Sequence, residues 1–183
     1  MEKTLQLNLR KDLLPFFFPL LQKGILIKTV GGENVRDLLF NRLGISDEYM
    51  EKRIQTVFLN GKAVDDLRSA VIPEGSVLAL SAAMPGLAGA TLRRGGTFAA
   101  MRQSITLNSE DAPASPKEGW VVLKIFNLLV SELGPQLLAA GIWLKGEDLT
   151  PLLETLKNSP GSRPGGSSHF GKEDLVFLNV SLE

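Results

Sequence analysis

The sequence contains no cysteine, which excludes disulfide bonds, thiolate nucleophiles, cysteine-ligated zinc and protein-bound iron–sulfur clusters. Its one histidine, His169, cannot form a histidine-rich metal centre by itself. Neither sign of charge is in excess, because 20 lysines and arginines balance 20 aspartates and glutamates. No net field therefore attracts the chain to nucleic acid or to anionic lipid, and we expect neither as a partner.

Length and composition indicate a soluble globular protein. The chain has 183 residues, of which 44% are hydrophobic, which suits one large domain or two small ones. The first ten residues alternate charged and apolar side chains and lack the order of a secretory signal. Two apolar stretches, residues 13–21 and 120–144, are interrupted by prolines or charges. We therefore expect a cytoplasmic protein that does not cross a membrane.

The stretch from Ile54 to Met84 predicts two strands and the turns that frame them. A short apolar run leads into Asn60–Gly61, a dipeptide that tolerates the positive φ of a tight hairpin turn. Pro73–Gly75 supplies a second turn, and the apolar run Val77–Leu80 follows it. The pattern is a short strand, a tight turn and a later buried strand.

Three segments nearer the N-terminus also have regular patterns. Residues Thr4–Leu9 alternate polar and apolar side chains, which predicts a first strand with one buried face. Ile25–Val30 is rich in β-branched residues and predicts a second strand. Apolar residues then recur at helical spacing from Asn34, which can cap the helix, to Gly44, which can end it. Such a helix can lie across a sheet built from the surrounding strands.

Together these segments resemble the small sulfur-carrier proteins of molybdopterin and thiamine biosynthesis, whose fold is the ubiquitin-like β-grasp. The resemblance covers roughly the first half of the chain and is carried by Glu33–Leu39, Val57–Lys62 and Pro73–Leu80. It implies a β-grasp fold and contact with a partner through the sheet surface and the tail. The matching surface positions, where we expect partner contact, are Phe58, Leu78 and Leu80.

The second half of the chain predicts a further α+β region. Phe98–Leu107 is a possible strand, and the apolar stretch Trp120–Leu133 is read as a buried helix. Thr150–Pro151 is a helix start, followed by an apolar stripe of leucines. The last segment, Leu175–Leu182, is a strand that could pair with Phe98–Leu107.

The predicted fold class is therefore α+β. We expect a ubiquitin-like β-grasp domain at residues 1–90, a linker at residues 91–96, and a smaller α+β domain at residues 97–183 with two or three helices and a strand pair. The segment from Ser81 to Gly96 is dense in alanine and glycine and marks the boundary. The apolar surface of the Trp120–Leu133 segment makes a homo-oligomer plausible.

Sulfur carriers of the resembled family act through a free C-terminal pair of glycines, whereas this chain ends in Glu183. An internal Arg93-Arg94-Gly95-Gly96 looks like the tail of a ubiquitin-type modifier. Cleavage after Gly96 would expose the carboxylate that a carrier needs, because glycines leave a partner's channel unobstructed. The alternative, which we favour, is that Gly95–Gly96 is a turn or hinge between the two halves.

Other candidate chemistry has a simpler interpretation. Gly166–Lys172 satisfies most of a phosphate-binding loop pattern, but Glu173 stands where a hydroxyl should bind Mg²⁺, so a mobile polar loop is favoured. His169 in that loop could act as a general base, although no nucleophile or orienting carboxylate is recognisable. The pairs Asp65–Asp66 and Glu110–Asp111 fit no calcium-loop pattern and are read as solvated turns.

A basic cluster in the linker region, Arg93, Arg94 and Arg102, could contact an acidic partner surface or a phosphate, with solubility as the favoured alternative. Our leading expectation is a non-enzymatic protein-binding module, without catalytic residues, cofactor or metal. The resemblance suggests an adenylating or cofactor-synthesis enzyme as its partner. The alternatives are a carrier activated by cleavage after Gly96, and a small enzyme or ligand-binding protein that uses the loop around His169.

Overall fold

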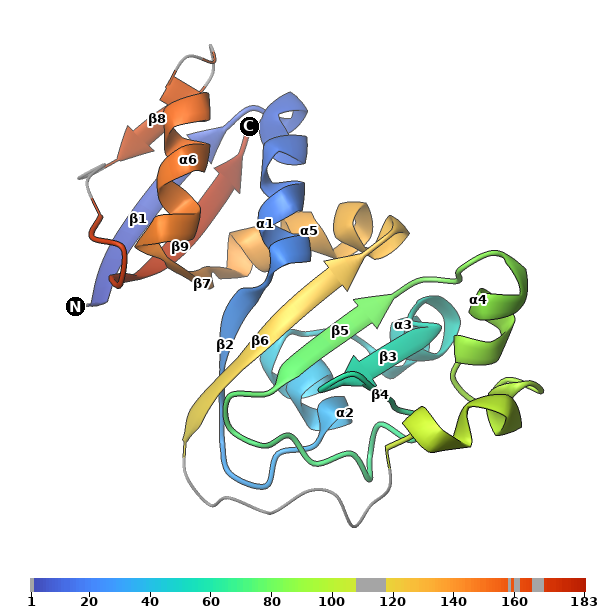
Figure 1. Cartoon of the computed structure of the whole chain (residues 1–183). Coiled ribbons are helices and arrows are strands. Elements are labelled where there is room, and N and C mark those ends of the chain that lie inside the picture. The colour runs from blue at the N-terminus through green and yellow to red at the C-terminus, as the bar shows by residue number, and fades with distance from the viewer. Residues whose placement is uncertain (1, 108–117, 158, 160–161, 166–169) are drawn as a thin grey trace. The chain divides into compact units, whose positions relative to one another are not determined.

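The structure is a computed structural model that describes residues 2–107, 118–157, 159, 162–165 and 170–183. It is mixed α/β, in agreement with the predicted class at that level (Figure 1). Contacts divide the chain into two compact units: unit 1 contains Met1–Leu26 and Val130–Glu183, and unit 2 contains Ile27–Leu129. This division differs from the predicted one at residues 91–96, because the N-terminal segment groups with the C-terminal segment.

The sheet of unit 2 has the strand order β4-β3-β5-β6-β2. Its hairpin joins β3 (Thr56–Leu59) to β4 (Lys62–Ala63), and the antiparallel β5 (Val77–Ser81) pairs with β3 on the other side. Asn60 and Gly61 have φ of 51° and 79°, so both turn residues are left-handed, as in the tight turn expected of this dipeptide. The predicted hairpin and late strand are confirmed.

The strand beside β5 is β6 (Gly119–Phe126), and the two run parallel. The prediction of a helix at Trp120–Leu133 was therefore wrong for its first half, and α5 (Leu128–Ala140) begins only after a break at Asn127. A strand with neighbours on both edges can be apolar along much of its length, which resembles a buried helix in sequence. Beyond β6 the sheet continues with β2 (Ile25–Thr29).

The predicted helix after Asn34 is confirmed, although it is irregular. It consists of α2 (Val35–Asp37) and a wider turn, η2 (Leu38–Arg42), and α3 (Asp47–Arg53) follows. Asn34 caps it, since its side chain accepts a hydrogen bond of 2.8 Å from the backbone N–H of Asp37, and Gly44 ends it at φ 66°. In Figure 1, α2 and α3 lie behind the sheet of unit 2.

The segment between β5 and β6 contains two short helices, α4 (Gly86–Leu92) and η3 (Ala99–Ile105). The predicted strand at Phe98–Leu107 was therefore wrong, and only its end approaches the sheet, where Thr106 forms a bridge with Ala63. The alternation of residues 101–107 is not decisive, because a short helix with an exposed apolar stripe can contain the same residues.

Unit 1 is built around two parallel strands, β1 (Glu2–Leu9) and β9 (Leu175–Leu182), which pair along their whole lengths. The antiparallel β7 (Ile142–Lys145) pairs with β9, and β8 (Ser162–Gly165) pairs with β1. Two predictions were wrong here. The N-terminal strand groups with unit 1, where it pairs with β9 and β8, and the C-terminal strand pairs with β1 and β7 instead of residues 98–107.

The helices of unit 1 bury the apolar segments that the sequence contains. The proline-interrupted segment forms η1 (Lys11–Phe17) and α1 (Phe18–Lys23), with Phe17 and Leu21 fully buried. The helix predicted from Thr150 begins earlier, as α6 (Gly146–Lys157), and its leucine stripe is buried as expected. Among the described residues, every helix is too short or too polar to span a bilayer.

Candidate functional site

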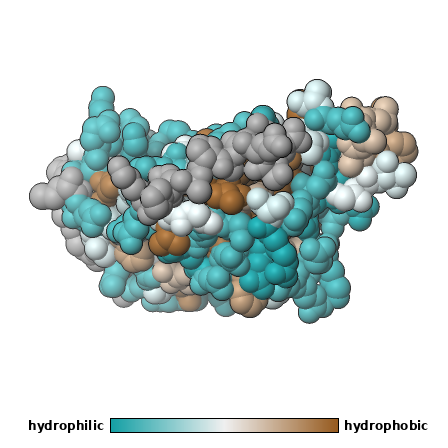
Figure 2. All heavy atoms as spheres, turned by 90° about the horizontal axis from the view of Figure 1, so that it is seen from below, coloured by the Kyte–Doolittle hydropathy of each residue, from teal (hydrophilic) through white to brown (hydrophobic). Residues whose placement is uncertain are grey.

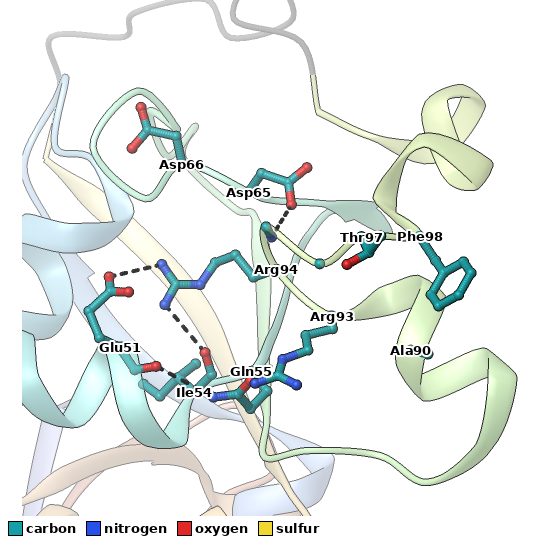
Figure 3. Close-up of a pocket in the computed structure, with 12 residues that line it drawn as sticks. Glu51, Ile54, Gln55, Asp65, Asp66, Ala90, Arg93, Arg94, Thr97 and Phe98 are labelled. Carbon is teal, nitrogen blue, oxygen red and sulfur yellow. Dashed lines mark hydrogen bonds and ion pairs between the residues drawn. The ribbon is translucent and has the colours of Figure 1, made fainter.

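A pocket of about 700 Å³ lies in unit 2, where the end of α3, the turn at Asp65–Asp66 and the loop after α4 come together (Figure 3). The predicted tail segment, residues 93–96, forms one wall of it. The complete lining consists of Glu51, Ile54, Gln55, Asp65, Asp66, Ala90 and residues 93–98.

Backbone hydrogen bonds hold this loop in place. The N–H of Arg94 donates to the carbonyl of Gln55 at 2.7 Å, and the N–H of Gly96 closes a turn onto the carbonyl of Arg93 at 3.1 Å. Gly95 has φ 60°, a conformation that glycine adopts without strain, and its N–H donates to Oδ1 of Asp65 at 2.8 Å. The two glycines therefore form a turn within unit 2 in the intact chain, and this turn does not join the two units.

Arg94 points back along the end of α3. Its side chain is only 11% exposed, and its Nη2 donates to the carbonyl oxygen of Met50 at 3.0 Å, with Nη1 3.4 Å from Oε1 of Glu51. A cation at the C-terminal end of a helix satisfies carbonyls that have no partner within the helix. Its Nε is buried without a hydrogen-bond partner among the described residues. Arg94 therefore joins the loop to α3 and is not available as an exposed docking residue.

Arg102 is even more deeply buried, at 3% exposure. Its Nη2 donates to Oδ1 of Asp65 at 2.6 Å, its Nε to the carbonyl of Thr91 at 2.8 Å, and its Nη1 to Oγ1 of Thr106 at 2.9 Å. One guanidinium thus ties α4, η3 and the Asp65 turn together, using the fixed fork of donors that arginine offers. Arg102, one residue of the predicted basic cluster, therefore holds three segments of unit 2 together and does not face solvent. We call Arg102 and its hydrogen-bond partners the clamp.

Asp65 receives hydrogen bonds from both sides of the loop. Partial burial alone would raise the pKa of its carboxyl group, but the hydrogen bonds from Arg102 and from the N–H of Gly95 outweigh burial and hold the pKa below its ordinary value. Asp65 is therefore ionised near neutral pH. Asp65 is part-exposed, as a turn residue can be, but it is also bonded to Arg102 and Gly95, whereas Asp66 remains exposed.

Arg93 differs from the other two arginines. It is exposed, it lines the pocket, and its side chain makes no hydrogen bond or ion pair with any described residue. Figure 3 labels Arg93 together with Gln55 and Ala90 among the residues that line the pocket. Arg93 is therefore the cation of the predicted cluster that remains available to a ligand or partner.

A second surface of unit 2 is the face of β3, β5 and β6 that lies away from α2 and α3. Register places Phe58 opposite Ala79 and Ala79 opposite Lys124, with Val77 opposite Val122 one step along. These side chains are half-exposed, whereas their neighbours along each strand are buried. The face is thus apolar with a lysine, and Lys28 of β2 lies with its Nζ 5.2 Å from the ring centroid of Trp120 at one end.

Register also decides which predicted contact residues can reach a partner. Phe58 lies on the half-exposed face, as the prediction requires. Leu78 and Leu80 are 0% exposed, because successive strand residues point to opposite sides and these two point into the core. Their assignment as surface contacts was wrong.

Several other predicted residues lie outside the described part of the chain. His169 and the first four residues of the Gly166–Lys172 pattern are among them, as are Glu110 and Asp111. Among the described residues, no group of three or more histidine, aspartate or glutamate side chains could hold a metal ion.

The comparisons with known proteins gave nothing: no protein family, no curated protein and no solved structure matches this chain.

The ion pair between Arg102 and Asp65 is the feature of the site that the sequence did not predict. Its partners are 37 residues apart, and the available signal was a single arginine within the otherwise apolar pattern of Phe98, Met101 and Ile105.

Proposed function

We propose that unit 2 is a non-enzymatic protein-binding module of the ubiquitin-like type, and that its partner binds the half-exposed face of β3, β5 and β6. The observation that carries the proposal is the face itself. Phe58, Val77 and Val122 are part-exposed on this side of the sheet, although their neighbours on the same strands form a buried core.

The arrangement of unit 2 supports a β-grasp with an unusual chain order. A mixed sheet with a helical segment on one side is what the resemblance to sulfur carriers implies. The strand beside β5 is supplied by residues 119–126 instead of the N-terminus. A strand in the same spatial place can come from a different part of the chain, since the sheet depends on pairing and not on connection order.

Charge indicates the chemistry of the partner. The strands of this sheet contain Lys28, Lys62 and Lys124 and no acidic residue. A partner surface with an apolar centre and acidic side chains at its edge would complement it. An adenylating or cofactor-synthesis enzyme in the cytoplasm is the first class of partner to test, because the resembled carriers bind such enzymes.

The test is affinity capture from a lysate of the source cells with three versions of the full chain: the natural sequence, Val122→Glu, and Asn8→Glu as a control. Val122→Glu places a carboxylate at the centre of the proposed face. Asn8→Glu adds the same charge at an exposed position of β1 in unit 1. Thermal unfolding of all three proteins establishes that they remain folded.

We expect one protein to be captured by the natural chain and by Asn8→Glu and to be lost with Val122→Glu. Charge reversal of Lys124 should weaken the same capture about tenfold, since opposite charges at an interface become like charges. Capture that survives Val122→Glu would overturn the proposed face. Failure of every version to capture a protein would overturn the proposed function.

A carrier activated by cleavage after Gly96 is the second candidate. Two observations weigh against it: Gly95 and Gly96 lie in a fixed turn, and β6, which comes after them in sequence, pairs with β5 within the sheet. Intact mass of the protein from its native cells separates the two candidates, because the carrier requires a product that ends at Gly96. A small enzyme that uses His169 is a third candidate, which a thermal-shift screen of ligands would test.

A further inference from the structure

The helix η3 has its polarity reversed relative to an ordinary surface helix. Its arginine, Arg102, is 3% exposed, whereas Met101 and Ile105 are 68% and 43% exposed, and Phe98, just before the helix, is 47% exposed. Phe98 and Met101 lie at the start of this 3-10 helix, and Ile105 lies beyond a kink at Arg102, whose φ of −118° and ψ of 22° are not helical. A surface helix normally presents its charged residue to solvent and buries its large apolar residues, and η3 does the opposite.

The neighbouring α4 extends the same apolar surface. Leu87 is 67% exposed, and the carbonyl of Thr91 near the end of α4 accepts a hydrogen bond from Arg102. In Figure 2, pale and tan atoms gather at the right, on the side of unit 2 where α4 and η3 lie in Figure 1. We use the term apolar arm for the surface formed by Leu87, Phe98, Met101 and Ile105.

The apolar arm is held rigidly although it contributes little to the core. Arg102 fastens η3 to α4 and to Asp65 through short hydrogen bonds, one of them to a carboxylate. A buried arginine is costly to desolvate, and a plain apolar residue at this position would commonly serve stability as well. The apolar arm is therefore presented to solvent by a fixed support, which reduces the conformational entropy that would be lost when a partner binds.

The apolar arm adjoins the pocket described above. Phe98 belongs to both, and Arg93 and Ala90 line the pocket next to it. The segment from residue 82 to residue 107 contains three arginines and no acidic residue, whereas Glu51, Asp65 and Asp66 also line the pocket. Two of these carboxylates are paired within unit 2, because Glu51 lies 3.4 Å from Nη1 of Arg94 and Asp65 lies 2.6 Å from Nη2 of Arg102. Arg94 and Arg102 are used internally, so Arg93 is the cation that an occupant would meet beside Phe98.

We infer that the apolar arm and the pocket beside it bind a short amphipathic peptide segment of another protein, with apolar side chains on Leu87, Phe98 and Met101 and a carboxylate paired with Arg93. At the exposures quoted, the four side chains offer on the order of 400 Å² of apolar surface. A stable globular dimer buries about 800 Å² per partner, so the available area fits a single peptide segment better than a second copy of the chain. The site lies apart from the sheet face and does not depend on that face binding a partner.

The test is selection of peptides against the full chain. A displayed library of random peptides of about 16 residues, roughly four turns of helix, is selected on the natural protein after removal of binders to Met101→Glu. The expected result is enrichment of sequences that combine leucine, isoleucine or phenylalanine at helical spacing with aspartate or glutamate. Absence of enrichment, or enrichment of basic sequences, would overturn the inference.

One selected peptide is then titrated against three variants. Met101→Glu should weaken binding at least about tenfold, because an apolar side chain that the bound peptide would bury is replaced by a charged one. Arg93→Gln should weaken binding about threefold to tenfold at low salt and remove most of its salt dependence. Gln103→Glu, an exposed position of η3 that is not part of the apolar arm, is the matched control and should bind like the natural protein. Equal binding by the natural protein and Arg93→Gln at all salt concentrations would contradict the assignment of Arg93.

Two further measurements exclude other occupants. Light scattering that shows a dimer of the natural protein, abolished by Met101→Glu, would replace the peptide by a second copy of the chain. Cosedimentation with phosphatidylserine-containing vesicles, abolished by the same substitution, would replace it by a membrane surface. We expect a monomer and no vesicle binding.

Discussion

Unit 1 and unit 2 each contain a pair of parallel strands with an antiparallel strand beside it, but the parallel pairs are formed differently. In unit 1 the pair joins the two ends of the described chain, β1 and β9. In unit 2 the pair is β5 and β6, and the connection between them contains α4 and η3. In unit 1, pairing of the most distant segments completes a buried core. In unit 2, the segment that connects the paired strands forms α4 and η3, which carry exposed apolar side chains. The exposed apolar surface that suggests binding is therefore in unit 2.

Each unit contains one of the two tryptophans of the sequence, so the unfolding of each unit can be followed by the fluorescence of its own tryptophan. Trp143 in unit 1 lies 5.1 Å from the ring of Phe177, centroid to centroid, and Trp120 in unit 2 lies under Lys28. Variants in which one tryptophan is replaced by phenylalanine report on a single unit. Fluorescence during urea unfolding of these variants follows unit 1 and unit 2 separately.

The largest effect is expected from removing core volume. Leu178→Ala in β9 and Leu80→Ala in β5 each truncate a side chain with 0% exposure, and each should cost about 3 kcal/mol of stability. Because each unit has its own core, Leu178→Ala should shift the Trp143 transition and Leu80→Ala the Trp120 transition. If both substitutions shift both transitions equally, the two units unfold as one cooperative structure and the comparison fails.

An intermediate effect is expected from the clamp of unit 2. Arg102→Met removes a buried guanidinium and leaves Asp65 without its ion pair, which should cost roughly 2–3 kcal/mol, less than a fully buried pair because Asp65 is partly exposed. The Trp120 transition reports the loss. Arg93→Met, the control from the same cluster, should change stability by no more than about 0.5 kcal/mol. A cost for Arg102→Met as small as that of Arg93→Met would show that the clamp is not a stabilising element.

The smallest effect is expected from acid. Hydrogen bonds from Arg102 and Gly95 outweigh burial and lower the pKa of Asp65 in unit 2, and a hydrogen bond from Lys3 lowers the pKa of Asp174 in unit 1. Both groups are more acidic folded than unfolded, so their contribution is fully present above the ordinary aspartate pKa of about 4 and is lost as pH falls through the lower pKa of the folded state. Asp65→Asn should flatten this dependence for Trp120, and Asp174→Asn for Trp143. If either substitution flattens the pH dependence equally for Trp120 and Trp143, the two carboxyl groups do not act on separate units, and the comparison is contradicted.

The local elements were predictable where short-range chemistry decides them. Asn60–Gly61 specifies its turn through backbone conformation, and Asn34 specifies a helix start through one side-chain hydrogen bond. Prediction failed where the outcome depends on a distant neighbour. Residues 119–126 have the same apolar character in a central strand as in a buried helix, and only their pairing with β5 decides between the two.

The candidate site was predictable in part for the same reason. Arg93, Arg94 and Arg102 were identified as a cluster because they are close in sequence, but their roles differ through partners that the sequence does not indicate. Two are tied to α3 and to Asp65, and one is left exposed. Leu78 and Leu80 were placed on the wrong side of the sheet, since alternation fixes that two sides exist but not which one a helix covers.

The sequence by itself determined the mixed α/β class, the hairpin, the capped helix and the exclusion of cysteine chemistry, because composition and local conformational preference are sufficient for these. Only the tertiary structure decided that β1 pairs with β9, that β6 pairs with β5, and that Arg93 is exposed while Arg94 and Arg102 are bonded within unit 2. The physical reason is that strand pairing and the burial of a charge depend on segments tens to more than a hundred residues away. Local sequence carries no record of which of several compatible partners will be met.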